Sequence, residues 1–242
     1  MIESVISSLS SGVLGAMFQN RSRLDELRCE HLALQIRQMQ GGAGPVIDAP
    51  LGDLVPEDER QDWIVLGERG SGKTALGVTL AQLVAGDQEI YALGFRKWAS
   101  DQLGIQTVTK GKLKDLRDCV LLVDETALHW SPTKLGDGMI SLLAVARHRN
   151  VSVIWTAQNS SQIDVRVLRH DFRLACKKLS VLQTRFDREE IGPVLLQAVG
   201  IQTQYASVFE NPEALLVFDG QWFVSRNGLP EGWSEKVSTL WR

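Results

Sequence analysis

Short apolar runs separated by helical patterns recur along most of this chain. Trp63-Ile64-Val65-Leu66 has the length and composition of a buried strand, and residues 75–84 behind it have helical spacing. Further apolar runs predict strands at 89–95, 120–123, 151–157 and 172–176, with helices expected within 96–118 and at about 138–149 and 188–199. Strands that alternate with helices favour a mainly parallel sheet covered by helices on both faces, so the pattern predicts an α/β fold.

The last part of the chain carries the strongest hairpin signal. Two strand patterns, 215–218 and 221–224, are joined through Asp219-Gly220, a dipeptide typical of tight hairpin turns. The sequence therefore predicts a C-terminal β-hairpin in a segment that begins at about residue 212.

The first 45 residues differ from the rest in their pattern. An apolar stripe with helical spacing runs through residues 1–18, and a more charged helical pattern follows at 21–40. The stripe consists of Ile2, Val5, Ile6, Leu9, Val13, Ala16 and Met17. Gly41-Gly42-Ala43-Gly44-Pro45 then interrupts the pattern as a linker. We therefore expect an N-terminal helical extension over 1–45 and one larger domain over 46–242.

The composition is that of an ordinary soluble globular chain, with 242 residues, 44% of them apolar and 23% charged. This length accommodates one main domain with small additions and excludes the paired motor domains of the large helicase superfamilies. The net charge of −3 gives no global sign of nucleic-acid binding, although basic residues gather at 96–117 and again at 147–188. The N-terminus lacks a basic leader and no apolar run reaches membrane-spanning length, so we expect a cytoplasmic protein.

The three cysteines are widely spaced and odd in number: Cys29, Cys119 and Cys176. Two of them lie in or beside apolar strand patterns, where a free thiol packs as a small hydrophobe. No spacing suggests a zinc site, so a reducing compartment is expected.

A complete G-x-x-x-x-G-K-T motif follows the strand at 63–66. It consists of Gly67, Glu68, Arg69, Gly70, Ser71, Gly72, Lys73 and Thr74. Glycines let successive backbone N–H groups turn toward a phosphate, and the N-terminus of the following helix adds partial positive charge. Lys73 would reach the β- and γ-phosphates of ATP, and the Thr74 hydroxyl would ligate Mg²⁺. A strand before the motif and a helix after it favour an ATP site over a glycine-rich turn.

The apolar run at 120–123 ends in two acids, Asp124 and Glu125. The carboxyl end of a buried parallel strand opens on the edge of the sheet where ligands bind. In a P-loop protein the first acid holds Mg²⁺, directly or through water, and the adjacent glutamate polarises a water for attack on the γ-phosphate. The pair therefore predicts an enzyme that hydrolyses ATP rather than a simple nucleotide-binding protein.

A glutamine closes the strand pattern at 151–157. Gln158 would hydrogen-bond the γ-phosphate or the attacking water and so report which nucleotide is bound. A lone glutamine after a strand is ordinarily a loop residue without a role. The P-loop and the acid pair make the sensor role the preferred interpretation.

These motifs resemble those of the FtsK/HerA superfamily of DNA-pumping ATPases. The resemblance rests on the P-loop, the acid pair, the Ala-Arg-His-Arg-Asn segment at 146–150 and the Thr-Ala-Gln strand end. Segments 169–173, 178–183 and 229–234 are similar to the genome-packaging ATPases of tailless, membrane-containing icosahedral viruses. The resemblance covers about 62–242 and does not extend to residues 1–45.

The resemblance implies a RecA-like sheet in which the Gln158 strand lies between the P-loop strand and the Asp124 strand. It also implies a ring homo-oligomer, usually a hexamer, with double-stranded DNA in its central channel. An arginine of one subunit would reach the nucleotide of its neighbour, because the planar, always charged guanidinium matches phosphate oxygens. Arg147, on the helix before the glutamine strand, best matches the family position. Arg149 and Arg169 are alternatives, and a solvated or DNA-facing role is equally open for each arginine.

The leading hypothesis is an ATP-driven translocase that packages viral double-stranded DNA into a preformed capsid, in the host cytoplasm and at the virion vertex. One alternative is an assembly and DNA-export ATPase of the filamentous-phage type, whose members normally carry a membrane-spanning segment after the motor domain. Another is a nucleotide-gated structural component of the vertex, which would not need both Glu125 and Gln158. The stripe at 1–18 either packs on the motor domain or docks on a neighbouring subunit, a capsid vertex protein or the virion's internal membrane.

Overall fold

The computed structural model describes residues 46–56, 60–180 and 187–238. The helices expected over 1–40 and the linker at 41–45 lie outside the described residues. The domain division at residue 45 and the role of the N-terminal stripe therefore stay predictions.

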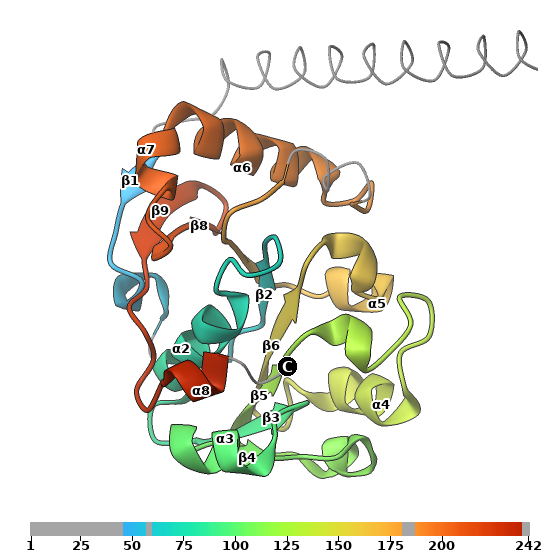
Figure 1. Cartoon of the computed structure of the whole chain (residues 1–242). Coiled ribbons are helices and arrows are strands. Elements are labelled where there is room, and N and C mark those ends of the chain that lie inside the picture. Colours follow the sequence, from blue (N-terminus) through green and yellow to red (C-terminus); the bar gives the residue numbers. More distant parts are fainter. Residues whose placement is uncertain (1–45, 57–59, 181–186, 239–242) are drawn as a thin grey trace, which may run out of the picture. The chain divides into compact units, whose positions relative to one another are not determined.

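The described strands form one sheet (Figure 1). They are β1 Ile47–Asp48, β2 Trp63–Leu66, β3 Glu89–Leu93, β4 Gln106–Thr107, β5 Cys119–Val123, β6 Val151–Ala157, β7 Arg173–Cys176, β8 Ala214–Phe218 and β9 Trp222–Arg226. Their order across the sheet is β1-β9-β8-β7-β2-β6-β5-β3-β4. Every pair from β7 to β4 is parallel, so the predicted mainly parallel sheet is confirmed.

The P-loop strand β2 is the central strand of the sheet, with β7 on one side and β6 on the other. β6 also pairs with β5, so that Thr156 lies opposite Val65 and Trp155 lies opposite Val123. The glutamine strand is therefore between the P-loop strand and the acid strand, as the family resemblance implied. Because parallel strands share one direction, the carboxyl ends of β2, β5 and β6 meet at the same edge, where ligands bind in such sheets.

The predicted C-terminal hairpin is also confirmed. β8 and β9 pair antiparallel from Ala214 opposite Arg226 to Phe218 opposite Trp222, and β8 joins the hairpin to β7. Gly220 in the connection has a φ of +74°, a left-handed conformation that glycine adopts without steric cost.

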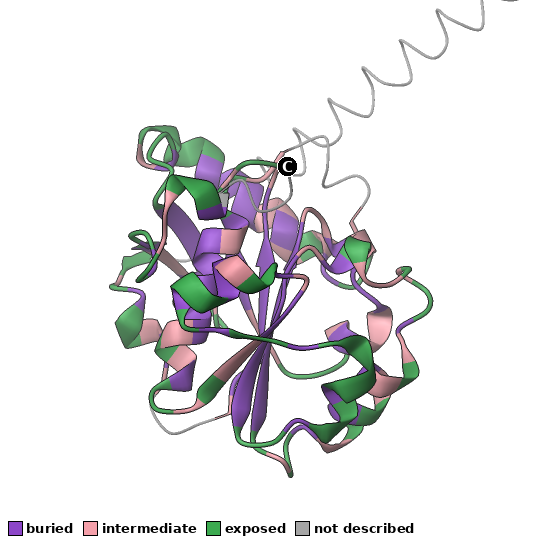
Figure 2. Ribbon diagram, turned by 60° about the horizontal axis from the view of Figure 1, so that its bottom comes forward, coloured by how far each residue is buried: buried purple, intermediate pink, exposed green. Residues whose placement is uncertain are grey.

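Helices lie on both faces of the sheet. They are α2 Lys73–Ala85, α3 Lys97–Leu103, α4 Asp137–Val145, α5 Val165–Leu168, α6 Gly192–Gln204, α7 Ala206–Phe209 and α8 Glu235–Ser238, with 3₁₀ turns η1 Gly52–Leu54, η2 Lys110–Asp115, η3 Thr126–Leu128 and η4 Ser160–Gln162. In β2, Trp63 and Val65 pack with α2, α3 and α8, whereas Ile64 and Leu66 pack with α4 to α7. Figure 2 shows the buried strands between these two layers. Burial on both faces explains the continuous apolar runs of the central strands.

The helix before β6 is shorter than expected. α4 ends at Val145, so Arg147 lies in the turn that follows and not on the helix. The turn closes through the Val151 N–H, which donates to the backbone oxygen of Ala146 at 2.9 Å. Asn150 has a φ of +52°, a left-handed conformation that asparagine tolerates after helix ends.

The remaining differences lie at element ends, at the edges of the sheet and in the short helices α5, α7 and α8, which were not expected. α6 begins at Gly192 and not near 188, because Pro193 suits the first helical turn, where no backbone N–H is needed. The edge strands β1 and β4 have two exposed residues each and were not expected. Their exposed side chains leave no apolar pattern in the sequence.

Candidate nucleotide-binding and hydrolysis site

The loop between β2 and α2 has a backbone shape suited to a phosphate. Gly70 and Gly72 have φ values of +81° and +89°, which glycine adopts readily. Gly67 is closely surrounded, since a Cβ there would lie 2.7 Å from Ser71 Oγ. The three glycines allow a tight loop that leads directly into α2 at Lys73. The first N–H groups of that helix are available to an anion.

The side chain of Lys73, the first residue of α2, reaches back into this loop. It is buried, and its Nζ donates to the backbone oxygen of Glu68 at 3.0 Å. Burial lowers the pKa of the Lys73 ammonium group, whereas the charges of Glu125, Asp124 and Glu68 act in the opposite direction. The lysine is thus within electrostatic reach of both acids at the sheet edge, and a bound triphosphate would further favour its charged form.

Thr74 and Asp124 bring two oxygen ligands together. The Thr74 hydroxyl donates to Asp124 Oδ2 at 3.1 Å, and Asp124 is fully buried. Oxygens on adjacent positions around an octahedral Mg²⁺, each at about 2.1 Å, lie about 3 Å apart, so this pair fits the ion. Among the described residues, no group of three or more His, Cys, Asp or Glu could hold a metal. Mg²⁺ would therefore complete its shell with phosphate oxygens and water, as this ion commonly does.

Thr156, on β6, connects the two acids. Its hydroxyl donates to Asp124 Oδ1 at 2.7 Å and accepts from the backbone N–H of Glu125 at 2.8 Å. The Thr126 hydroxyl in turn donates to the backbone oxygen of Thr156 at 2.9 Å. Both carboxylate oxygens of Asp124 are therefore oriented, one by Thr74 and one by Thr156. Sequence reasoning gave Thr156 no role, although a hydroxyl within an apolar strand was an available signal.

Gly77 lets α2 approach this part of the sheet. A Cβ on Gly77 would lie 2.9 Å from Thr156 Cγ2 and 3.1 Å from Leu122 Cδ1. A larger side chain would therefore displace the helix that carries Lys73 and Thr74 from the strands that carry their acidic partners.

Glu125 has a backbone conformation that residues with side chains rarely adopt. Its φ of +49° and ψ of +66° lie in the left-handed region, at a cost of about 1–2 kcal/mol. The conformation is held by the bond from its N–H to Thr156 and by the Leu128 N–H, which donates to the Glu125 backbone oxygen at 2.8 Å. Strain of this kind persists where the surrounding structure maintains it, and it is often found at functional sites.

Gln158 follows β6 and contacts the expected catalytic base. Its side-chain Nε2 donates to Glu125 Oε1 at 3.2 Å. Its backbone N–H donates to Gln162 Oε1 at 2.9 Å, which fixes the start of the loop. The structure therefore brings the P-loop, both acids and the glutamine to one place at the sheet edge.

His129 is a second residue of this site that sequence reasoning missed. Its Nε2 lies 3.0 Å from the backbone oxygen of Asp124, and burial lowers the pKa of the imidazole. A carbonyl oxygen only accepts, so the neutral ring donates from Nε2. His129 thereby fixes the turn after the acid pair. No sequence spacing marked it.

The candidate arginines lie elsewhere. Arg147 is exposed before the amino end of β6, whereas Gln158 follows its carboxyl end. At about 3.3 Å per residue, the seven residues of β6 separate these ends by about 20 Å. Arg149, in the same turn, donates to the backbone oxygen of Lys114, and Arg169 is exposed at the end of α5. Arg147 and Arg149 therefore lie at the edge of the sheet opposite the P-loop.

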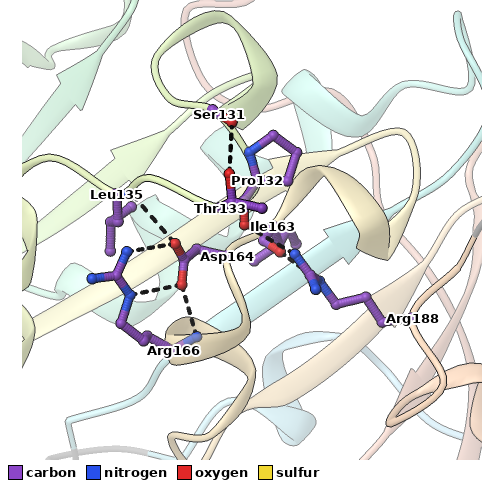
Figure 3. A network of polar contacts seen from close by, with 8 residues as sticks. All are labelled: Ser131, Pro132, Thr133, Leu135, Ile163, Asp164, Arg166 and Arg188. Carbon is purple, nitrogen blue, oxygen red and sulfur yellow. Dashed lines mark hydrogen bonds and ion pairs between the residues drawn. The ribbon is translucent and has the colours of Figure 1, made fainter.

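A polar network joins the loops that follow β5 and β6 (Figure 3). Asp164 accepts from Nε and Nη2 of Arg166 at 2.9 and 2.7 Å and from the backbone N–H of Leu135 at 3.2 Å. The hydrogen bond from the Arg166 guanidinium lowers the pKa of the Asp164 carboxyl to about 2. Arg188 donates to one backbone oxygen in each of the two loops, at 2.8 and 3.0 Å. The loops that begin at Asp124 and Gln158 are thus held together at a distance from the P-loop.

A cavity of about 280 Å³ lies on the β7 side of the P-loop, opposite to β5 and β6. Its lining comes from the end of β7 and from α6 and α7 and includes Lys178, Leu179, Val199, Gln202, Thr203 and Phe209. The cavity adjoins the P-loop, because the Glu68 N–H donates to the backbone oxygen of Lys178 at 2.8 Å.

Comparison with known proteins adds a likeness in fold. No model of a protein family and no curated protein sequence matches the chain. Among solved structures, the genome-packaging NTPase B204 of Sulfolobus turreted icosahedral virus 2, in complex with AMPPCP, matches over 70% of this chain and 98% of its own, with a TM-score of 0.51 and 13% identity. The conjugation coupling protein TcpA of pCW3, with ATPγS, matches over 75% of this chain and 64% of its own, with a TM-score of 0.51 and 10% identity.

The strand order and the P-loop at the end of β2 define a P-loop NTPase fold of the RecA-like type, as the sequence predicted. Within that class, the chain resembles the genome-packaging NTPase B204 and the coupling protein TcpA in fold, which agrees with the FtsK/HerA resemblance of its motifs. No helix in the described part of the chain has the length and apolar character needed to cross a bilayer.

Proposed function

We propose that this protein is a Mg²⁺-dependent ATPase that drives double-stranded DNA into a preformed viral capsid. The observation that carries the proposal is a chain of hydrogen bonds beside a loop shaped for phosphates. It runs from Thr74 to Asp124, from Asp124 to Thr156, and from Thr156 to the backbone N–H of Glu125. The fold shared with a genome-packaging NTPase supports packaging among the DNA-related roles.

The P-loop would bind the phosphates of ATP. Backbone N–H groups at the start of α2 and the Lys73 ammonium group would surround the β- and γ-phosphates. Thr74 and Asp124 would hold Mg²⁺, which when bound neutralises charge on the phosphate oxygens. Thr156 would keep the Asp124 carboxylate turned toward that position.

Glu125 would act as the general base toward the attacking water. Its carboxylate accepts from Gln158 at Oε1, so one N–H of the Gln158 amide is already directed at the expected base and not at the γ-phosphate or the water. We infer that a bound triphosphate draws the amide away and leaves the Glu125 carboxylate to the water. In this way Gln158 would link recognition of ATP to its hydrolysis.

The nucleoside end of ATP would extend toward the cavity beside Lys178. Glu125 and Gln158 mark the γ-phosphate side of the P-loop, on β5 and β6, so the rest of the nucleotide points toward β7. Apolar walls such as Val199 and Phe209 suit the flat face of a nucleobase.

Hydrolysis would be completed in a ring by an arginine of the neighbouring subunit. Arg147 is exposed at the edge opposite the P-loop of its own chain, so it could serve only the nucleotide of another subunit. A ring homo-oligomer, expected to be a hexamer, with double-stranded DNA in its channel is part of the proposal. The ring would bind a protein of the capsid vertex through residues 1–18 of its subunits.

Steady-state ATP hydrolysis with and without linear double-stranded DNA tests the proposal. A translocase should hydrolyse ATP faster when DNA is present, and the stimulation should fall with salt, because phosphate contacts release counterions. The Lys73→Ala variant, which lacks the phosphate-binding lysine, gives the background rate of ATP hydrolysis. Slow turnover that DNA leaves unchanged would instead favour a nucleotide-gated component of the vertex.

A further inference from the structure

Lys177 is a buried lysine beside the P-loop that the proposed hydrolysis does not use. It follows the last residue of β7 and is 1% exposed. Its Nζ donates to the backbone oxygen of Pro212 at 2.6 Å, to Asn227 Oδ1 at 2.8 Å and to the backbone oxygen of Ala214 at 3.4 Å. All three acceptors are neutral, so these bonds hold the cation without cancelling its charge.

The side chain of Lys177 runs against the P-loop. Its backbone N–H donates to the backbone oxygen of Leu66 at 2.9 Å, which continues the pairing of β7 with β2. A Cβ on Gly67 would lie 2.9 Å from Lys177 Cβ, and a Cβ on Gly72 would lie 3.5 Å from Lys177 Cε. The stem therefore lies close to the loop at both its first and its last glycine.

We propose that Lys177 is a positioning residue of the phosphate site, a fixed second cation that strengthens triphosphate binding from inside the protein. The inference rests on the proposed ATPase function. Lys73 would contact the phosphates directly, whereas Lys177 would act through the loop that its stem supports. Because Lys177 is shielded from water, its field at an anion in the loop is screened less than that of a surface lysine.

The surroundings leave this cation only weakly compensated. Burial lowers the pKa of Lys177 to about 8, and the charge of Glu213 acts in the opposite direction. The other charged side chains on the elements around it are Glu68 and Arg69 in the P-loop, Lys73 on α2, Arg173 on β7, Lys178 after β7 and Arg226 on β9, and α6 has none. Glu68 is already paired with Lys178 at 3.5 Å. A bound triphosphate would favour the charged form of Lys177, and by linkage the charged form favours the triphosphate.

The acceptors of Lys177 belong to the base of the C-terminal hairpin. Ala214 is the first residue of β8, Pro212 lies in the turn before it, and Asn227 follows β9. The Asn227 N–H also donates to the backbone oxygen of Glu213 at 3.1 Å, which closes the base of the hairpin. The hairpin would thus influence nucleotide binding by holding this cation in place, without contacting the nucleotide.

Binding of an AMPPCP–Mg²⁺ complex to the full-length protein, measured between pH 7 and pH 9.5, tests this role. Lys177→Met keeps an unbranched apolar stem and removes the charge. At pH 7 we expect its dissociation constant to be about tenfold higher than that of the wild type. The difference should shrink as the pH rises past about 8, where the wild-type lysine loses its proton. Lys73 is present in both proteins, so its direct contact with the phosphates contributes to both dissociation constants. Lys112→Met, at an exposed lysine on η2, is the matched control.

Asn227→Asp is a second variant that decides the question even if Lys177→Met does not fold. The aspartate has the shape of asparagine and places a negative charge against the ammonium group, so it should weaken binding at pH 7 by a similar factor. Unchanged affinity in either folded variant, at every pH, would overturn the inference and leave Lys177 a structural residue. A wild type that binds no nucleotide would overturn the proposed function as well, so the two failures are distinguishable.

Discussion

The side-chain amide of Gln158 donates to Glu125 Oε1 at 3.2 Å, so the expected sensor of the γ-phosphate contacts the expected activator of water. The two residues are brought together by the pairing of β5 with β6, which sets Val123 opposite Trp155. In the proposed function, a bound triphosphate would compete with Glu125 for the Gln158 amide, so this contact would change when ATP binds.

Glu125→Gln should bind ATP with nearly wild-type affinity and hydrolyse it about 10²- to 10⁴-fold more slowly, because the shape is kept while the base is lost. Analogue binding and single-turnover hydrolysis measure the two properties separately. Glu190→Gln, at an exposed position before α6, is the matched control. Turnover at the wild-type rate would show that another group activates the water.

Gln158→Ala should lower kcat about 10- to 100-fold and change KM by less than about threefold, because the amide is needed where charge develops in the transition state. Steady-state kinetics over a range of ATP concentrations give this split. Gln162→Ala removes only the acceptor of the Gln158 backbone N–H and should have the smaller effect. A raised KM with unchanged kcat would instead assign Gln158 to ground-state binding.

Thr156→Val should reduce stability and the response to Mg²⁺ together. Valine keeps the packing but removes the donor to Asp124 Oδ1 and the acceptor of the Glu125 N–H, a loss of about 1–3 kcal/mol. Denaturant unfolding should show the loss, and half-maximal hydrolysis should need more Mg²⁺. Thr79→Val, which removes only a bond to the Ala75 backbone oxygen, is the control and should show neither effect. Wild-type Mg²⁺ dependence in Thr156→Val would contradict the proposed orientation of Asp124.

Arg147→Ala should bind ATP normally, hydrolyse it poorly and inhibit wild-type subunits in mixed assemblies, because the guanidinium would serve the neighbour's nucleotide. Hydrolysis by mixtures of wild-type and variant subunits measures the effect. Arg117→Ala, exposed before β5 at the same edge of the sheet, is the control. Activity that falls only in proportion to the variant fraction would count against a role in trans.

Asp164→Asn should destabilise the protein at neutral pH by about 1–2 kcal/mol, a modest value because Arg166 is 41% exposed and solvent screens the pair. Arg166 lowers the pKa of Asp164 from 3.8 to about 2. The folded pKa lies below the unfolded one, so the stabilisation is present above about pH 4 and is lost as the pH falls through 2. Thermal unfolding at pH 7, 4 and 2.5 should show that the stability difference between the wild type and Asp164→Asn shrinks as the pH falls. Asp101→Asn, on α3, is the control. A difference independent of pH would mean that charge is not its source.

Local patterns were enough to place the central strands, the P-loop and the hairpin. A strand buried on both faces must be apolar throughout, and the glycines at 67, 70 and 72 are required by the loop itself. Asp219-Gly220 likewise encodes a turn within two residues. The edge strands β1 and β4 could not be predicted from local patterns, because two exposed residues form a strand only through pairing with a neighbouring strand.

The sequence by itself determined the central strands, the hairpin, the P-loop, the acid pair and Gln158, since apolar runs, glycine motifs and polar strand ends are properties of neighbouring positions. Only the tertiary structure decided which of these residues meet. Gln158 and Glu125 are 33 positions apart, and Thr74 and Asp124 are 50 apart, so their contacts depend on the order of the strands. The same order places Arg147 at the far edge and holds the charge of Lys177 inside the protein, because packing, and not sequence distance, decides what surrounds a side chain.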